Sequence, residues 1–295
     1  MDLRDCFEAI AQVQNDLRDN CLSELNLAGE NWWMLLRHDF TRPFTTRRSA
    51  VYRRHFRTVS HTDPTAMAVS RRAHPAPWHA RRLGQNGLAS AREDLLEAAQ
   101  AGARPWAHYG LFRDHNEWVD GRLFNRIADA WIDALGLHDE LLKLCPFDAP
   151  APRHAFWLDP LWLVEAPEAR SSSAELEPGQ TRRFLKAHDR LSTYCRERSI
   201  PFFSDHETVL HRIAGCLTQA GHWEALLALA RPRFLALSSF FTEDRAPVML
   251  AARRRGIPVC DLEHGFIGPW SPYAFLEGLP VAAQAWLPQV FWCLG

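Results

Sequence analysis

Apolar residues recur at three- and four-residue steps near the N-terminus, a spacing typical of a helix that buries one face. Phe7, Ile10 and Val13 begin this series, which predicts that residues 3–40 are helical, with a possible break at Gly29. Trp32 and Trp33 follow each other directly. Because neighbouring positions on a helix point in different directions, we expect only one of the two to face the local core and the other to pack against the second part of the protein or line a groove.

The pattern of apolar and polar residues in the middle of the chain predicts several different elements in succession. An aromatic-rich run predicts a strand over residues 106–112. Apolar residues on one face predict a helix over residues 123–135, with Gly136 as the residue that ends it. The proline-rich passage 146–167 is expected to cross between two halves of the chain.

From residue 181 onward, short apolar runs alternate with amphipathic segments. This alternation predicts an α/β fold: a Rossmann-like parallel sheet with helices on both faces, preceded by a mainly helical N-terminal region. We accordingly divide the chain into a helical, arginine-rich region over 1–100 and an α/β domain over 101–295. The expected helices are 181–198, 205–230 with Asp205 as its cap, and 243–255. The expected strands are 200–203, 234–238 and 257–262.

The composition excludes several classes of protein and kinds of site. Apolar residues make up 47% of the chain, charged residues 23%, and the net charge is −1, which is the balance of a globular protein and not of a disordered one. The seven cysteines include no CxxC pair, so neither a disulfide framework nor a zinc site is predicted. The N-terminus lacks the apolar core of a secretory signal, and we expect a cytoplasmic protein with reduced thiols.

One basic segment departs from this overall balance. Ten arginines, from Arg42 to Arg82, share the segment with a single acidic residue, Asp63. One interpretation is an exposed, solvated face. The other is a surface for a polyanion: nucleic acid, an acidic polysaccharide, or the anionic lipid headgroups at the inner face of a membrane, which it would contact peripherally. Nucleic acid is the least favoured partner, because the segment contains neither a recognition helix nor an aromatic stacking platform.

Polar residues cluster where two predicted strands end, and ligands of open α/β sheets bind at the carboxyl ends of strands. His264 is a candidate general base, or else a hydrogen-bonded structural histidine. Asp261 and Glu263 alternate along the chain and can share one face, but no third ligand lies nearby, so no metal site is predicted. The residues at the two strand ends are Ser238, Ser239 and Glu243 after the first and Asp261, Glu263, His264 and Gly265 at the second.

Several short motifs occur in a shared order. They are Trp32 to Arg37 (W-x-x-L-R in related helices), Asp120-Gly121 with Asn125 and Asp129, Arg231-Pro232-Arg233, Gly256-Ile257-Pro258, Glu263-His264-Gly265, Tyr273, Pro288-Gln289, and Trp292 with Gly295. In this order the chain resembles the N-terminal, acceptor-side domain of GT-B-type glycosyltransferases of bacterial capsule and lipopolysaccharide biosynthesis. Two positions depart from the family pattern: Glu263 replaces a glutamine, and Gln289 replaces an aspartate.

The resemblance implies transfer of a sugar from a nucleotide-sugar donor to a glycan acceptor. His264, Glu263 and Asp261 are then the expected catalytic residues. We expect the chain itself to bind no cofactor, since it has neither a GxGxxG motif nor a P-loop. The donor would be held by a C-terminal lobe or a separate subunit. The alternative is a non-catalytic domain of the same fold that binds a glycan, a partner protein or an anionic surface. The expected substrate-binding residues are Ser238, Ser239, Glu243, Gly265 and Tyr273.

Overall fold

A computed structural model describes residues 3–40, 106–109, 116–119, 122–125, 127–137, 140–144, 157–158, 176–202, 204–240, 245–262, 276 and 278–292. Contacts group the chain into two compact units, each assembled from three segments. Unit 1 comprises residues 1–62, 174–216 and 265–287, and unit 2 comprises residues 63–173, 217–264 and 288–295. The boundary expected near residue 100 and the arginine-rich segment 42–82 lie outside the described residues, so both stay predictions.

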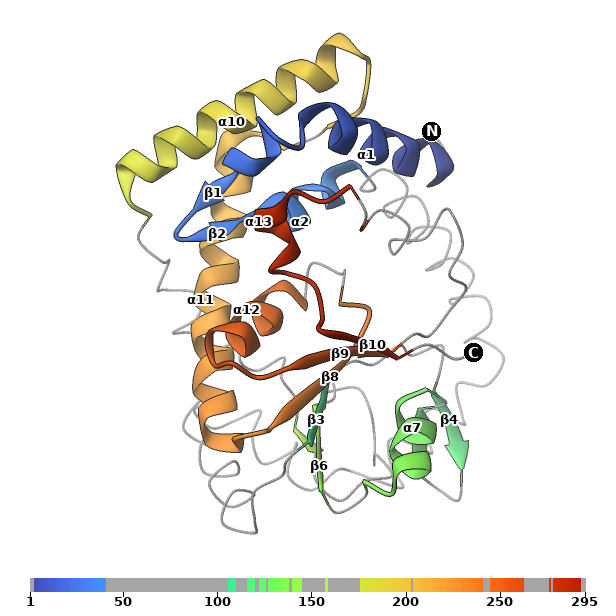
Figure 1. The fold of residues 1–295 in the computed structure, drawn as a ribbon. Helices are drawn as coiled ribbons and strands as arrows, with labels where there is room; N and C mark the ends of the chain where they lie inside the picture. The colour runs from blue at the N-terminus through green and yellow to red at the C-terminus, as the bar shows by residue number, and fades with distance from the viewer. Residues whose placement is uncertain are drawn as a thin grey trace, which may run out of the picture. The chain divides into compact units, whose positions relative to one another are not determined.

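Unit 2 contains a six-stranded sheet in the order β10-β9-β8-β3-β6-β7, and every neighbouring pair is parallel (Figure 1). The prediction of an α/β fold with a parallel sheet is therefore confirmed. The first strand along the chain, β3, is central; the next two extend the sheet on one side, and the last three on the other. The strands are β3 (Trp106–Tyr109), β6 (Leu141–Leu144), β7 (Trp157–Leu158), β8 (Phe234–Ser238), β9 (Val259–Leu262) and β10 (Val290–Trp292).

Both faces of the sheet are buried at its centre, as expected for parallel strands. On one face, Trp131 and Ile132 of α7 (Ala128–Leu135) form a core cluster with Ala236, Cys260 and Leu262. Residues that alternate with these point to the other face, and they are at most 2% exposed: Leu235, Leu237 and Val259.

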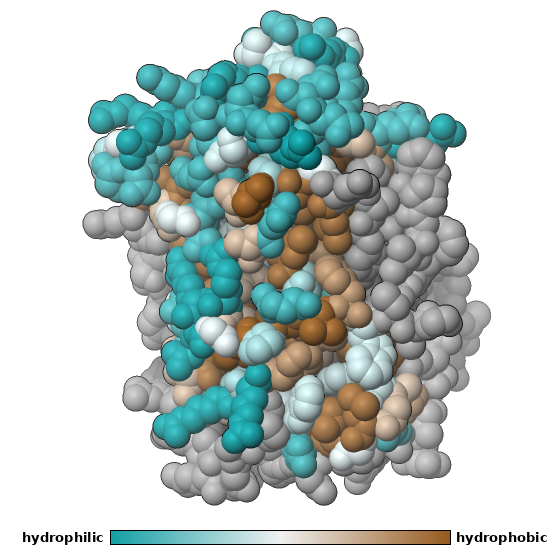
Figure 2. Space-filling view, viewed as in Figure 1, coloured by the Kyte–Doolittle hydropathy of each residue, from teal (hydrophilic) through white to brown (hydrophobic). Residues whose placement is uncertain are grey.

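The three long helices predicted from residue 181 onward are present as α10 (Pro178–Glu197), α11 (His206–Ala230) and α12 (Ala246–Arg254). The carboxylate of Glu177 accepts hydrogen bonds from the backbone N of Gly179 and Gln180 and so begins α10. Asp205 begins α11 in the same way by accepting from Thr208 N at 2.7 Å. Figure 2 shows the outward side of α10 as hydrophilic. Among the described residues, no helix is both long and apolar enough to cross a membrane.

The predicted strand over residues 200–203 is wrong for residues 200–202, which are irregular. The ring of Phe202 instead packs 5.1 Å from Phe40 and 5.5 Å from His188, measured between ring centroids. The apolar run is therefore a half-buried connection between two helices of unit 1, packed through the ring of Phe202. Short apolar runs do not by themselves distinguish these two outcomes.

The helix predicted over residues 123–135 is also wrong in its first turn. Residues up to Asn125 belong to β5 (Arg122–Asn125), which pairs with β4 (Asn116–Val119) in an antiparallel hairpin. The Asn125 side chain accepts hydrogen bonds from the backbone N of Ile127 and Ala128. These bonds favour the beginning of α7 after Asn125 and disfavour a helix that continues through this residue. Gly136, with φ at 66°, ends α7 as predicted.

The N-terminal segment is not one helix. After α1 (Leu3–Leu17) come a 3₁₀ turn (Leu22–Glu24), a hairpin of β1 (Asn26–Leu27) and β2 (Glu30–Asn31), and the short α2 (Trp33–Leu36). The two hairpin-loop residues, Ala28 and Gly29, have φ values of 55° and 80°. Positive φ at both loop positions defines the type I′ turn that suits the twist of a two-residue hairpin. Another short helix of unit 1, α13 (Val281–Gln284), lies near the C-terminal end.

The expectation that only one tryptophan of the adjacent pair faces the core is wrong, because Trp32 and Trp33 are both fully buried. The indole N–H of Trp32 donates to Leu27 O, and its ring packs 5.4 Å from Trp286. Trp33 donates instead to Gln14 Oε1. Different segments of unit 1 thus cover the two sides of this short helix, which local periodicity does not reveal.

Candidate functional site

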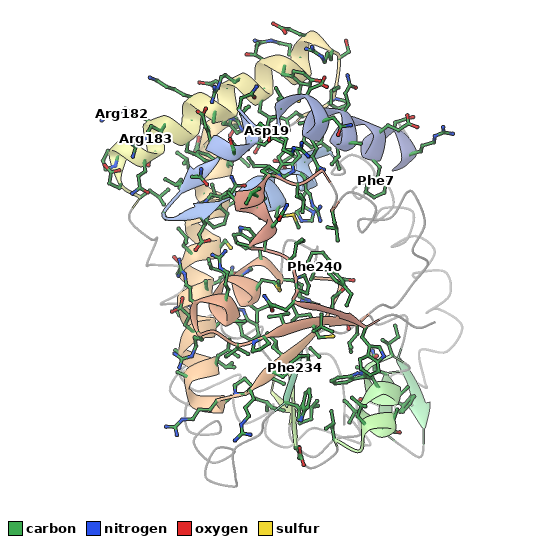
Figure 3. The ribbon with its side chains drawn as sticks, in the orientation of Figure 1. Phe7, Asp19, Arg182, Arg183, Phe234 and Phe240 are labelled. Carbon is green, nitrogen blue, oxygen red and sulfur yellow. The ribbon has the colours of Figure 1, made fainter. Side chains whose placement is uncertain are left out.

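The carboxyl ends of β8 and β9 lie side by side and bring two of the predicted polar groups together. In the register of the two strands, Ser238 is opposite Leu262, and Leu237 is opposite Asp261. Figure 3 labels Phe234 at the beginning of β8 and Phe240 just beyond its end. Ser238, Ser239 and Asp261 therefore share one edge of the sheet, as the sequence predicts for strands running in the same direction.

Asp261 is 1% exposed, and its Oδ1 accepts a hydrogen bond from Phe240 N at 2.9 Å. This bond ties the end of β9 to the chain that leaves β8. Between the two strands' ends, Ser239 has a φ of 64°, in the left-handed region that costs a non-glycine residue about 1–2 kcal/mol. Such strain persists only where surrounding contacts hold it, and it is common at binding and catalytic sites. Asp261 supplies one such contact.

Arg245 is a residue of this edge that sequence reasoning missed. It is 5% exposed, directly precedes α12, and its Nε donates to Ser238 O at 3.4 Å. A cation at the beginning of a helix is opposed by the helix dipole, so its placement there needs a compensating contact. The only feature of the sequence that could have indicated this residue is an arginine at a helix start, two positions before Pro247. The Arg245 side chain fixes the backbone where β8 ends.

The neighbouring strand β10 is held to β9 by Gln289, which directly precedes it. Its side-chain Oε1 accepts from Val259 N at 2.7 Å, and its own backbone N donates to Val259 O at 2.9 Å. Phe291 packs edge-on against Phe240, with ring centroids 5.6 Å apart. Gln289 therefore has a structural role at this edge.

These polar groups fix the backbone at the edge of the sheet and are themselves shielded from solvent. Ser238, Ser239, Arg245 and Asp261 are each at most 5% exposed, so a ligand outside the sheet would meet the residues that follow the strands. A buried carboxylate and guanidinium at this edge fix the backbone in place, which is the supporting role that a binding site requires. The remaining candidates lie outside the described residues and stay predictions: Glu243, Glu263, His264, Gly265 and Tyr273.

Comparison with known proteins adds no relative: no protein-family model, no curated protein and no solved structure matches this chain. The sequence motifs and the geometry of this edge are therefore the features that bear on function.

Proposed function

We propose that the chain is a glycosyltransferase of bacterial surface polysaccharide synthesis, or its acceptor-binding lobe, and that the acceptor glycan binds at the carboxyl edge of the sheet in unit 2. The main support for the proposal is the strand order: when the six strands of this sheet are numbered 1 to 6 along the chain, their order across the sheet is 3-2-1-4-5-6. This is the order of doubly wound Rossmann sheets, in which ligands bind outside the carboxyl ends of the strands where the order reverses.

The order reverses between β3 and β8, which are paired. Ser238 is the last residue of β8 and Ser239 follows it at this position, while Asp261 is the last residue but one of the next strand, β9. The polar groups predicted from the sequence therefore lie beside the expected binding position. This agreement supports the GT-B-like interpretation, whose motifs come from the same strand ends.

The proposed chemistry is attack of an acceptor hydroxyl on the sugar carbon that bears the nucleotide. The hydroxyl loses its proton to a base as the bond to the new sugar forms, and the nucleotide leaves with the electrons of the broken bond. His264 is the proposed base, with Glu263 orienting it. Asp261 acts as a positioning residue through its bond to Phe240 N. The nucleotide-sugar is bound mainly by a further lobe or subunit.

The proposal includes a cytoplasmic location, with peripheral contact between the arginines from Arg42 to Arg82 and an anionic membrane. Such contact is electrostatic, so sedimentation with vesicles containing an anionic lipid should weaken steeply as salt increases. Absence of sedimentation at low salt would leave only a solvated basic face.

The test of activity uses the full-length protein with a panel of nucleotide-sugars and bacterial surface oligosaccharides, and mass spectrometry to detect transfer. His264→Ala should lower turnover about 10²–10⁴-fold, the usual effect of losing a general base, without changing the circular dichroism spectrum. The matched control is Glu140→Gln, because Glu140 is exposed and immediately precedes β6 at the opposite end of the sheet. Full activity in His264→Ala would remove the catalytic assignment, and glycan binding without any transfer would favour a non-catalytic module.

A further inference from the structure

Three potential metal-ligating side chains meet in unit 1, far along the sequence from the residues considered above. His188 and Asp189 belong to α10, and His206 is the first residue of α11. One ligand atom from each of the three residues lies within 4.8 Å of the other two. Nε2 of His206 is 2.7 Å from Oδ1 of Asp189. Two histidines and one carboxylate are a common set for binding a divalent transition metal.

His188 points to a ligand independently of this clustering. Its side chain is 1% exposed, yet neither ring nitrogen has a hydrogen-bond partner among the described residues. Buried polar groups are nearly always satisfied, so an unpartnered imidazole calls for an explanation. A metal ion bound by one of these nitrogens would supply the missing partner.

The surroundings of His188 hold its ring in place. Its ring centroid lies 6.3 Å from that of Phe184, 5.5 Å from that of Phe202 and 5.4 Å from that of His206. Burial, together with the neighbouring His206, lowers the pKa of His188 to about 4.

The cluster is also accessible. His188, Asp189 and His206 line an open hollow of about 500 Å³, to which Ser204 and Asp205 also contribute. The side chains of His206 and Asp189 are 45% and 62% exposed, so an ion can enter from solvent. The buried hydroxyl of Ser204 has no hydrogen-bond partner among the described residues either, and it is available to a water molecule on the ion.

We propose that His188, Asp189 and His206 bind one divalent transition-metal ion, of which Zn²⁺ is the probe of choice. The ion would lie between Nε2 of His206 and Oδ1 of Asp189 in place of the hydrogen bond that joins them, and the hydrogen of the neutral imidazole would then be on Nδ1. Ligand atoms around a tetrahedral zinc ion lie about 3.4 Å apart, so the three groups need only small side-chain rotations to reach it. Three protein ligands leave a fourth position open, as in zinc sites that bind water or a substrate.

The experiment titrates Zn²⁺ into chelator-treated, full-length protein by calorimetry and counts bound ions by elemental analysis after dialysis. We expect one ion per chain. His206→Ala and Asp189→Ala should each weaken binding at least about 10–100-fold, which is the loss seen even for residues that only support metal ligands. His211→Ala is the matched control, because His211 is an exposed histidine on the same helix, and it should leave affinity unchanged.

His188→Phe gives a second, separate readout. It keeps an aromatic ring beside Phe184 and Phe202 but removes both nitrogens, so it should fold and lose the ion. With Co²⁺ in place of Zn²⁺, the visible absorption of a tetrahedral cobalt site should appear in the unmodified protein and in His211→Ala alone.

The proposal is overturned if the unmodified protein binds no Zn²⁺, or if His206→Ala and Asp189→Ala bind it as tightly as His211→Ala does. These two variants change exposed side chains, so they decide the question even if His188→Phe fails to fold. The site lies in unit 1, and none of these results depends on whether the chain transfers sugars.

Discussion

Arg212→Ala should be among the most destabilising single substitutions in unit 1. Nη1 of Arg212 lies 2.7 Å and 2.8 Å from the two carboxylate oxygens of Asp39, and Nη2 donates to Leu35 O at 3.1 Å. The Arg212 side chain is 9% exposed, and that of Asp39 is fully buried. Removing one partner of a buried ion pair leaves the other charge poorly compensated, which costs about 3–5 kcal/mol.

That loss is a large part of the roughly 5–15 kcal/mol that stabilises a typical protein, so urea unfolding followed by circular dichroism should detect it as a clearly lower midpoint. Arg212→Lys keeps the charge but not the fork of donors, so it should lie between the unmodified protein and Arg212→Ala. The matched control is Arg4→Ala, because the Arg4–Glu8 pair is 63% and 52% exposed and should contribute less than about 0.5 kcal/mol. A loss below about 1 kcal/mol for Arg212→Ala would refute the reasoning.

Four further results are expected. Gly136→Ala should lower the free energy of unfolding by about 1 kcal/mol, because a φ of 66° disfavours a side chain even where space is open. Gly215→Ala, inside α11 and also in open space, should instead raise the free energy of unfolding by about 0.4–1 kcal/mol. Urea unfolding that shows the same sign for both variants would contradict this. Burial raises the pKa of Cys21 to about 11 and that of Cys195 to about 12. At pH 8 both thiols should therefore resist a disulfide reagent until urea unfolds the protein. Rapid labelling of the native protein would contradict the burial of these thiols. The hydrogen bonds that Glu177 accepts from Gly179 N and Gln180 N lower its pKa, so its stabilising effect should be present above the ordinary carboxyl pKa and be lost as the pH falls through the lowered one. Glu177→Gln should therefore reduce the acid sensitivity of the unfolding midpoint, and an unchanged pH profile would show that the cap contributes nothing.

The sequence predicted best those elements whose signals are local. Asp205 and Gly136 are a cap and a stop that act on neighbouring backbone, and the structure places both as expected. Strands β8 and β9 were also found, because each is a short apolar run next to a capped helix. The adjacency of Ser238 and Asp261 then followed from the parallel direction of the two strands.

The errors arose where distant contacts decide the outcome. Phe202 is not in a strand because the rings of Phe40 and His188 pack against it in a connection between helices. Trp32 and Trp33 are both buried because separate segments cover them. Periodicity along one segment contains no information about which other segments will pack against it.

The proposed metal-binding cluster in unit 1 could not be predicted from the sequence for the same reason. His188 and His206 are 18 positions apart and lie on different helices, so no spacing motif joins them. Arg245 likewise looks like a surface residue of a helix start until the structure shows it buried beneath the end of β8. Burial of a charged group depends on packing, which the local sequence leaves open.

The most direct test of the proposed function is to map the binding site by nuclear magnetic resonance. Deuterated, ¹⁵N-labelled protein would be titrated with oligosaccharides released from bacterial capsule and lipopolysaccharide. We predict saturable shifts of the backbone amides from Ser238 to Phe240 and of those just after Leu262, at the carboxyl ends of β8 and β9. The absence of saturable shifts with every glycan, or shifts confined to the opposite end of the sheet near Glu140, would contradict the account.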